Sequence, residues 1–401
     1  MPLNRRCIRA SLFLLATQGF ACGSGANTTM SASTSGGSSV TSTSGASTTG
    51  AGGAGGGFHV APHAPFPQLP DQGGPTLDKV HIVSVSYAGT KYATELGAFG
   101  DWLVTSTWFT GRGAEYGVGA GTHEQRLLSA APPTTLSTSD AVSFITSRVM
   151  SGDLPAPTPE TLYMLYVPPE TALTDIEGGC DGGNAYPSAF HMSGTMGATT
   201  FQYAMVPICA QSSIDWIEGG AGHEIIETAT DPLPLTKPAY QFAPGDPWIS
   251  ITGEVADLCE ALPNATVDAF SVPLVWSNAA AKKGDGWPCL PAPTTPYFGV
   301  SAPDPEVTVA AGASTAVTLS PWSSAPVDAW SVETYVQDVY PPSVSFVPKA
   351  TLSTSVVQNG DPLTLSIDAP AGAAHGAEAL VVLISTAGKL RTFWPIVVKV
   401  P

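Results

Sequence analysis

The chain has 401 residues, which is enough for two or three domains that each bury a hydrophobic core. Only 12% of the residues are charged, and 42 Gly and 37 Pro favour an exported protein that is rich in strands and loops. The formal net charge of -17 argues against a nucleic-acid partner and against adsorption to anionic lipid headgroups.

Residues 1–21 have the features of a signal peptide. Three arginines precede a short apolar stretch, residues 11–16, which is too short to remain in a bilayer as a helix. Cys22 follows a small residue in a pattern that resembles a lipobox, so we expect Cys22 to be lipidated. The protein would then be exported and held on the cell envelope, at the outer surface or in the periplasm, with the lipid as its only membrane contact. Simple cleavage after Ala21, which would secrete the protein, is the alternative.

Residues 23–57 consist almost wholly of Gly, Ser, Thr and Ala and carry no charge. Such a segment cannot bury enough apolar area to offset its loss of conformational entropy, so we expect a disordered tether.

Residues 58–295 are expected to form one α+β domain, either zincin-like or mixed α/β. Alternating or continuous apolar patterns predict three strands, and apolar residues at helical spacing predict three helices. In chain order these are a strand at 79–87, helices at 95–109 and 139–150, strands at 161–167 and 200–207, and a helix at 214–230. Ser139 or Asp140 is the expected N-cap of the second helix.

Residues 300–401 have a different sequence pattern, in which short strand-like segments are separated by Gly, Pro, Asn and Asp. The expected strands are 306–309, 316–319, 343–347, 363–367, 379–385 and 392–400. This spacing predicts an all-β, Ig-like sandwich with a binding, spacing or stabilising role.

The sequence His223-Glu224-Ile225-Ile226-Glu227 lies within the last predicted helix. Residues four apart share a helix face, so His223 and Glu227 can ligate one ion together. Glu224 lies beside that face, where its carboxylate can take a proton from a water molecule; it is therefore the predicted catalytic base. This is the zincin pattern with Glu in place of the second His, and it predicts Zn²⁺ as the cofactor. The alternative is a solvated helix face without a metal.

A third ligand is required, and the sequence leaves three candidates. Glu254 and Asp257 are two carboxylates three residues apart, and Asp257 could instead orient His223 from outside the ligand set. His191, between Phe and Met, is the other candidate, although a histidine in such surroundings is more often buried and hydrogen-bonded. His123 also begins a His-Glu pair, but the motif is not completed, and we interpret His123 as an ordinary loop residue.

Four cysteines lie outside the signal region, and in an exported chain disulfides are expected. Three pairings are possible. We favour Cys180 with Cys209 and Cys259 with Cys289, because each pair closes a local loop.

Several segments together resemble the EXORDIUM / phosphate-induced family. They are GHEIIETATDP, GEVADLCE, VPLVWSN at 272–278 and the later Cys289, preceded by EYGVGAG and YAMVPIC, and they cover about residues 79–295. The resemblance implies an exported protein linked to the cell wall or envelope. The positions that match the family are His223, Glu224, Glu227, Glu254, Asp257, Cys259 and Cys289. The tether and the C-terminal β region depart from the plant members and favour surface display.

The leading functional hypothesis is a zinc-dependent, peptidase-like hydrolase on the cell envelope. In this hypothesis His223, Glu227 and one of Glu254, Asp257 or His191 hold the zinc ion, and Glu224 acts as general base. The alternative is a non-catalytic envelope module that binds carbohydrate or protein, with a structural metal or none. The expected partner is thus a peptide or a cell-wall or extracellular polymer, and not nucleic acid.

Overall fold

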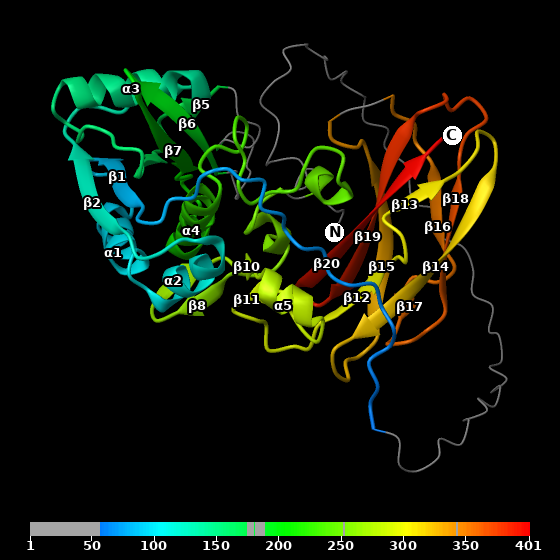
Figure 1. Ribbon diagram of the computed structural model, residues 1–401. Helices are drawn as coiled ribbons and strands as arrows, with labels where there is room; N and C mark the ends of the chain where they lie inside the picture. The colour runs from blue at the N-terminus through cyan, green and yellow to red at the C-terminus, as the bar shows by residue number, and fades with distance from the viewer. Residues whose placement is uncertain (1–56, 175–179, 181–188, 252, 342–343) are drawn as a thin grey trace, which may run out of the picture. The chain divides into compact units, whose positions relative to one another are not determined.

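The computed structural model describes residues 57–174, 180, 189–251, 253–341 and 344–401 (Figure 1). The predicted signal peptide, the predicted lipidation of Cys22 and residues 23–56 of the predicted tether lie outside the described residues. Among the described residues, no helix combines the length and the apolar character that crossing a bilayer requires.

The first part of the described chain is mixed α/β and is organised around one five-stranded sheet. Its strand order is β2-β1-β4-β7-β6, with β2, β1, β4 and β7 parallel and β6 antiparallel at one edge. The strands are β1 (His81–Tyr87), β2 (Thr122–Leu128), β4 (Thr161–Val167), β6 (Phe190–Met196) and β7 (Thr199–Pro207). All of β4 is buried, as expected of a central strand whose two faces are both covered.

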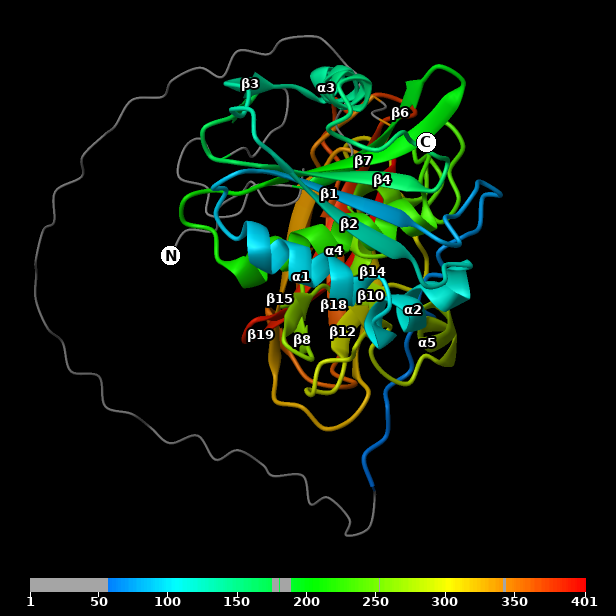
Figure 2. The same ribbon diagram turned by 90° about the vertical axis from the view of Figure 1, so that its left-hand side faces the viewer.

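Helices cover both faces of this sheet. Figure 2 shows α3 (Thr138–Met150) on one side and both α1 (Ala93–Leu103) and α4 (Ile214–Thr230) on the other. Alternate residues of each strand point to opposite faces, so Tyr163 and Leu165 pack with the α3 layer, whereas Leu162 and Met164 pack with the α1 and α4 layer. The sheet therefore separates two apolar cores, and the helix that carries the HExxE motif belongs to the larger one.

The single helix predicted at 95–109 is wrong, because the structure divides it into α1 and α2 (Thr107–Gly113). Ser106 causes the division: its backbone is extended, and its Oγ accepts a hydrogen bond from the Phe109 N–H at 3.0 Å. A serine in this position satisfies an N–H group that would otherwise lack a partner, and thus starts a new helix.

The predicted N-cap of α3 is also displaced. Ser137 is the cap, and Asp140 is the third helical residue of a capping box, in which each side chain bonds the other's backbone N–H. The sequence contains four possible capping residues in a row at 137–140, and the first of them is the cap.

The remaining short elements of this part are η1 (Ala114–Tyr116), β3 (Thr135–Leu136), β5 (Ala172–Leu173), η3 (Pro247–Ser250), η4 (Asp257–Cys259), β8 (Ala265–Val267), β9 (Phe270–Val272), β10 (Val275–Trp276), α5 (Asn278–Lys283) and β11 (Cys289–Leu290). The strands predicted at 79–87, 161–167 and 200–207 and the helix at 214–230 are confirmed within two residues at each end. Strands β2 and β6 had no predicted counterpart, and His123 lies in β2 rather than in a loop.

The C-terminal part consists of two further sheets, of order β12-β14-β18-β16 and β13-β20-β19-β15-β17. All pairs are antiparallel except β13 with β20, an arrangement compatible with a β-sandwich. The strands are β12 (Phe298–Ser301), β13 (Glu306–Thr308), β14 (Ser314–Ser323), β15 (Trp330–Gln337), β16 (Lys349–Leu352), β17 (Val356–Val357), β18 (Leu363–Asp368), β19 (Glu378–Ala387) and β20 (Leu390–Lys399).

Five of the six strands predicted for this part are present. The strand predicted at 343–347 begins outside the described residues, and the described 344–347 contribute only an isolated bridge between Ser345 and Glu378. Strand β15 was not predicted, although its Trp330 is 1% exposed and packs in the core.

Both predicted disulfides are confirmed. Cys180 pairs with Cys209 and Cys259 pairs with Cys289, so each bond closes a loop of about thirty residues.

Candidate metal centre

Helix α4 positions the HExxE motif deep in the first part of the chain. Ser213 caps its start by accepting from the Trp216 N–H, and the helix ends at Thr230, with Asp231 as its C-cap. The glycines of its first half permit close approach of the β8–β9 hairpin: a Cβ at Gly219 would lie 1.8 Å from the Asn264 amide nitrogen. The helix therefore packs closely, and most of its second half is buried.

His223, Glu227 and Asp257 bring three donor atoms together. His223 Nε2 lies 3.0 Å from Glu227 Oε2 and 3.3 Å from Asp257 Oδ1. The first pair comes from one helix face, as the i, i+4 spacing predicts, and Asp257 is the first residue of η4. All three donor atoms lie within 4.8 Å of one another, close enough to hold one ion.

The backbone of residues 253–257 fixes the orientation of both carboxylates. Glu227 Oε1 accepts hydrogen bonds from the N–H groups of Ala256 at 3.2 Å and Asp257 at 3.0 Å. Asp257 Oδ2 accepts from the N–H groups of Gly253 at 3.0 Å and Glu254 at 3.3 Å. Each carboxylate thus has one oxygen held by two N–H groups, while its other oxygen faces His223 Nε2.

The distances from His223 Nε2 to the two carboxylate oxygens fit a tetrahedrally coordinated metal ion. With zinc–ligand bonds of about 2.0–2.2 Å, two ligand atoms of a tetrahedral site lie about 3.4 Å apart. The 3.0 and 3.3 Å separations around His223 Nε2 are close to this value. The same distances also fit a protonated imidazole that bridges two carboxylates, so geometry alone is consistent with either occupant.

A second group of donors adjoins the first and shares Glu227 with it. His191, on edge strand β6, places Nδ1 at 3.3 Å from Glu224 Oε2 and at 4.0 Å from Glu227 Oε2. On the other side of the ring, Nε2 lies 3.5 Å from Glu254 Oε1 and 3.3 Å from the backbone carbonyl of Asp231. His191, Glu224 and Glu227 also satisfy the distance condition for one ion.

The structure thus separates the three candidates for the third ligand. Asp257 converges on His223 and Glu227, whereas Glu254 and His191 face each other in the second group. The predicted base Glu224 also lies in the second group, next to His191. We refer to the two groups of donors together as the centre. Asp231, whose backbone carbonyl contacts His191 Nε2, was not predicted as part of it. The only signal in the sequence was its place at the end of the helix, before Pro232.

The centre buries an excess of negative charge. Glu224, Glu227, Asp231, Glu254 and Asp257 are each at most 6% exposed, and only two histidines lie among them. Within the described residues, the ion pairs that contain Lys or Arg lie elsewhere: they involve Arg126, Arg148 and Lys399. Buried charges are expensive unless they are paired or coordinate a metal, so this composition favours a bound cation.

The pKa values of these side chains reflect the same excess of buried negative charge. Burial, and then the charge of Asp257, raise the pKa of Glu227 to about 7, although His223 opposes the shift. Burial and the surrounding carboxylates raise the pKa of Glu254 well above its ordinary value. Burial alone would lower the pKa of His223, but Glu227 and Asp257 outweigh it, so that pKa lies well above its usual range. Carboxylates in such a group favour their charged forms only when a cation is near.

Solvent reaches the centre from the His223 side. The His223 side chain is 17% exposed, whereas those of His191, Glu224 and Glu227 are 3–5% exposed. A ligand from outside would therefore approach the donors of the first group before those of the second.

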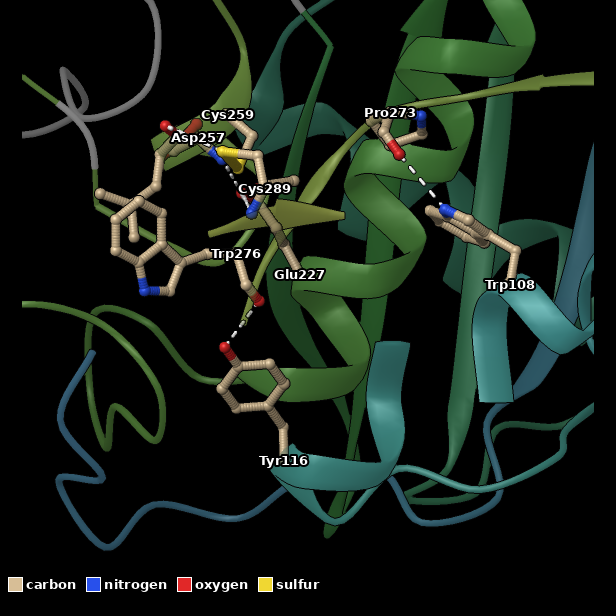
Figure 3. The surroundings of a disulfide bond; sticks show 10 residues. Trp108, Tyr116, Glu227, Asp257, Cys259, Pro273, Trp276 and Cys289 are labelled. Atoms are coloured by element: carbon tan, nitrogen blue, oxygen red, sulfur yellow. Dashed lines mark hydrogen bonds between the residues drawn. A yellow bond between two sulfur atoms is a disulfide. The ribbon is translucent and has the colours of Figure 1, made fainter. Parts of the chain in front are cut away.

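The Cys259–Cys289 disulfide supports the loop that carries Asp257. Figure 3 shows Glu227 of α4 extending toward the backbone of Asp257, with the disulfide beside it. Cys259 is two residues from Asp257 and is 2% exposed. Next to this disulfide, Tyr116 donates a hydrogen bond to the carbonyl of Trp276 at 2.7 Å. The loop is therefore held covalently and by packing, not by local sequence alone.

Ser84, His123 and Asp101 form a separate hydrogen-bonded chain. His123 Nε2 lies 3.0 Å from Ser84 Oγ, and His123 Nδ1 lies 2.7 Å from Asp101 Oδ1. A Ser-His-Asp arrangement can activate a nucleophile, but Ser84 is 1% exposed on a central strand, so a substrate cannot reach its hydroxyl. These hydrogen bonds connect α1 to strands β1 and β2 of the sheet. The interpretation of His123 as an ordinary loop residue is wrong, because it lies in β2.

Comparisons with known proteins leave the family of the chain open. No family model matches the sequence, and no curated protein matches it. One similar solved chain comes from a study titled "Structural basis of T cell specificity and activation by the bacterial superantigen toxic shock syndrome toxin-1". It is 13% identical, its whole length covers 26% of this chain, and the TM-score is 0.18, too low to support an argument.

Proposed function

We propose that the protein is a zinc-dependent hydrolase of gluzincin-like type that acts on peptide bonds. The observation that carries the proposal is the convergence of His223 Nε2, Glu227 Oε2 and Asp257 Oδ1, with the second oxygen of each carboxylate held by two backbone N–H groups. Such preorganisation is what a metal site needs, because the donors do not have to be reoriented on binding.

The roles of the chain's own residues follow from their placement. His223, Glu227 and Asp257 would hold Zn²⁺, which when bound supplies Lewis acidity that polarises a carbonyl group and acidifies water. Glu224 would take the proton from the attacking water and return it to the leaving amine. His191, 3.3 Å from Glu224 Oε2, would orient that carboxylate.

The cellular setting is part of the proposal. The apolar stretch at 11–16, the candidate lipidation site Cys22 and the Gly/Ser/Thr-rich residues 23–57 support an exported protein tethered to the envelope. The resemblance to the EXORDIUM / phosphate-induced family supports a link to the cell wall, and a peptide or an envelope polymer would be the substrate. The β-rich C-terminal part, with its proposed Ig-like fold, would then be a spacer or a binding module.

Casein cleavage by the full-length chain tests the proposal. We expect cleavage that a chelator abolishes and Zn²⁺ restores. Glu224→Gln should lower turnover by about 10²- to 10⁴-fold while at least one zinc ion stays bound. Glu218→Gln is the matched control: Glu218 is buried on the same helix, but it accepts from the Ser271 N–H and lies outside the centre. Stoichiometric zinc without cleavage of casein or of a broad peptide library would contradict the proposal.

Burial favours a second candidate, a binding module whose metal is structural. Among the side chains in these ion pairs of the centre, only that of His223 is more than 10% exposed. A substrate would therefore have little access to the donor atoms. In that case Glu224→Gln leaves ligand binding unchanged. A chelator lowers the melting temperature, and the wild type shows no turnover of peptide substrates.

A further inference from the structure

Glu227 belongs to both groups of donors, and its two oxygens have different environments. Oε1 is occupied by the N–H groups of Ala256 and Asp257, so Oε2 alone faces the histidines. Oε2 lies 3.0 Å from His223 Nε2 and 4.0 Å from His191 Nδ1. A carboxylate oxygen with an imidazole nitrogen on each side is placed to contact two cations.

The hydrogen bonding of His191 defines which nitrogen is the donor. The carbonyl of Asp231 can only accept, so Nε2, at 3.3 Å from it, carries the proton. In the neutral ring Nδ1 then has a lone pair that faces the carboxylates of Glu224 and Glu227. Three acceptors that face one another repel unless a proton on Nδ1 or a metal cation lies between them. A histidine that ligates a metal usually donates its other N–H to a carbonyl or carboxylate, as this one does.

Glu254 provides an independent indication that one cation is too few. Its side chain is 8% exposed and points at His191, yet Oε1 is fully buried and has no hydrogen-bond partner. If all five buried carboxylates are ionised, two protonated imidazoles leave three charges uncompensated, and one divalent ion beside a protonated His191 leaves two. A second divalent ion reduces the excess to one.

We propose that the centre binds two divalent cations: one at His223, Glu227 and Asp257, and a second at His191 and Glu224, with Glu227 Oε2 shared between them. Glu254 lies outside the second ligand set and compensates its charge from across the His191 ring. The inference rests on the proposed metal site, and it makes Glu224 a ligand whenever the second ion is bound. Its role as general base then belongs to the one-ion form.

Zinc stoichiometry of the full-length chain, measured by elemental analysis after dialysis against Zn²⁺, tests the inference. We expect two equivalents in the wild type and one in His191→Ala and in Glu224→Gln. The matched control His81→Ala, on strand β1 of the same sheet and 33% exposed, should keep two. Circular dichroism verifies that each variant is folded.

Glu254→Gln provides a test that does not remove a ligand. It should weaken the second zinc equivalent by about 10- to 100-fold, as loss of a supporting residue does, and leave the first unchanged. One equivalent in the wild type, or two in His191→Ala, would overturn the second site and leave the proposed function standing. No bound zinc in the wild type would overturn both.

Discussion

The two parts of the chain differ in how much charge they bury. The α/β part buries the carboxylates of Glu218, Glu224, Glu227, Asp231, Glu254 and Asp257 together with His191. Among the described residues from 298 onward, the buried polar residues are Ser301, Ser323, Ser385 and Thr392, and none of them carries a charge. A region that has only to fold avoids buried charge, because desolvation costs more than packing returns. The charges of the α/β part therefore indicate a function.

Removal of Glu227 should have the largest effect, because both groups of donors share its Oε2. Glu227→Ala should weaken zinc binding by more than about 100-fold, which a competition titration against a chelator measures. Glu218→Ala on the same helix is the control and should leave affinity unchanged. If Glu227→Ala binds zinc like the wild type, the contrast between the two parts has no functional meaning.

Loss of the Cys259–Cys289 disulfide should affect both stability and the centre. Cys259→Ser with Cys289→Ser should lower the free energy of unfolding by about 3–4 kcal/mol, because the bond closes a loop of about thirty residues. The loop that orients Glu227 and Asp257 also loses its support, so we expect zinc affinity to fall. Denaturant unfolding in a chelator, together with a zinc titration, measures both. Unchanged affinity would show that packing alone holds the loop.

A cavity in the C-terminal part should change stability alone. Leu365 lies on β18 and is fully buried, so Leu365→Ala should cost about 2–5 kcal/mol. Zinc affinity should not change, since no described residue of this region is a donor in the centre. The variant also serves as an equally destabilised control for the disulfide, and reduced zinc affinity in it would show that the two parts are coupled.

An exposed ion pair of the same region should have the smallest effect. Lys399, whose side chain is 39% exposed, contacts Glu306 at 2.7 Å and Glu378 at 3.3 Å. Lys399→Ala should change the free energy of unfolding by less than about 1 kcal/mol, because water screens exposed pairs. A larger loss would mean that surface charges in this region do more than keep the protein soluble.

The sequence predicted the elements whose signals are local. The helix at 214–230, the strand at 161–167 and the i, i+4 pairing of His223 with Glu227 depend on periodicity, and each is confirmed as geometry. Residues that act across the fold were harder to identify. Asp257 and Glu254 were both candidates in the sequence. Only the fold separates them, because it places Asp257 Oδ1 3.3 Å from His223 Nε2 and Glu254 Oε1 3.5 Å from His191 Nε2.

Other errors have the same origin. Strands β2 and β6 were missed because edge strands of this sheet carry mixed polar residues that do not alternate clearly. His191 therefore had no assigned element, and its place opposite Glu224 could not be inferred. The break at Ser106 was missed because apolar spacing continues across it, whereas a single hydroxyl cap decides the boundary.

Anomalous diffraction at the zinc absorption edge, from crystals of the full-length protein grown with Zn²⁺, tests the central claim most directly. The account predicts an anomalous peak about 2.0–2.2 Å from His223 Nε2, Glu227 Oε2 and Asp257 Oδ1. Ordered side chains at these three positions in such crystals without this peak would contradict it.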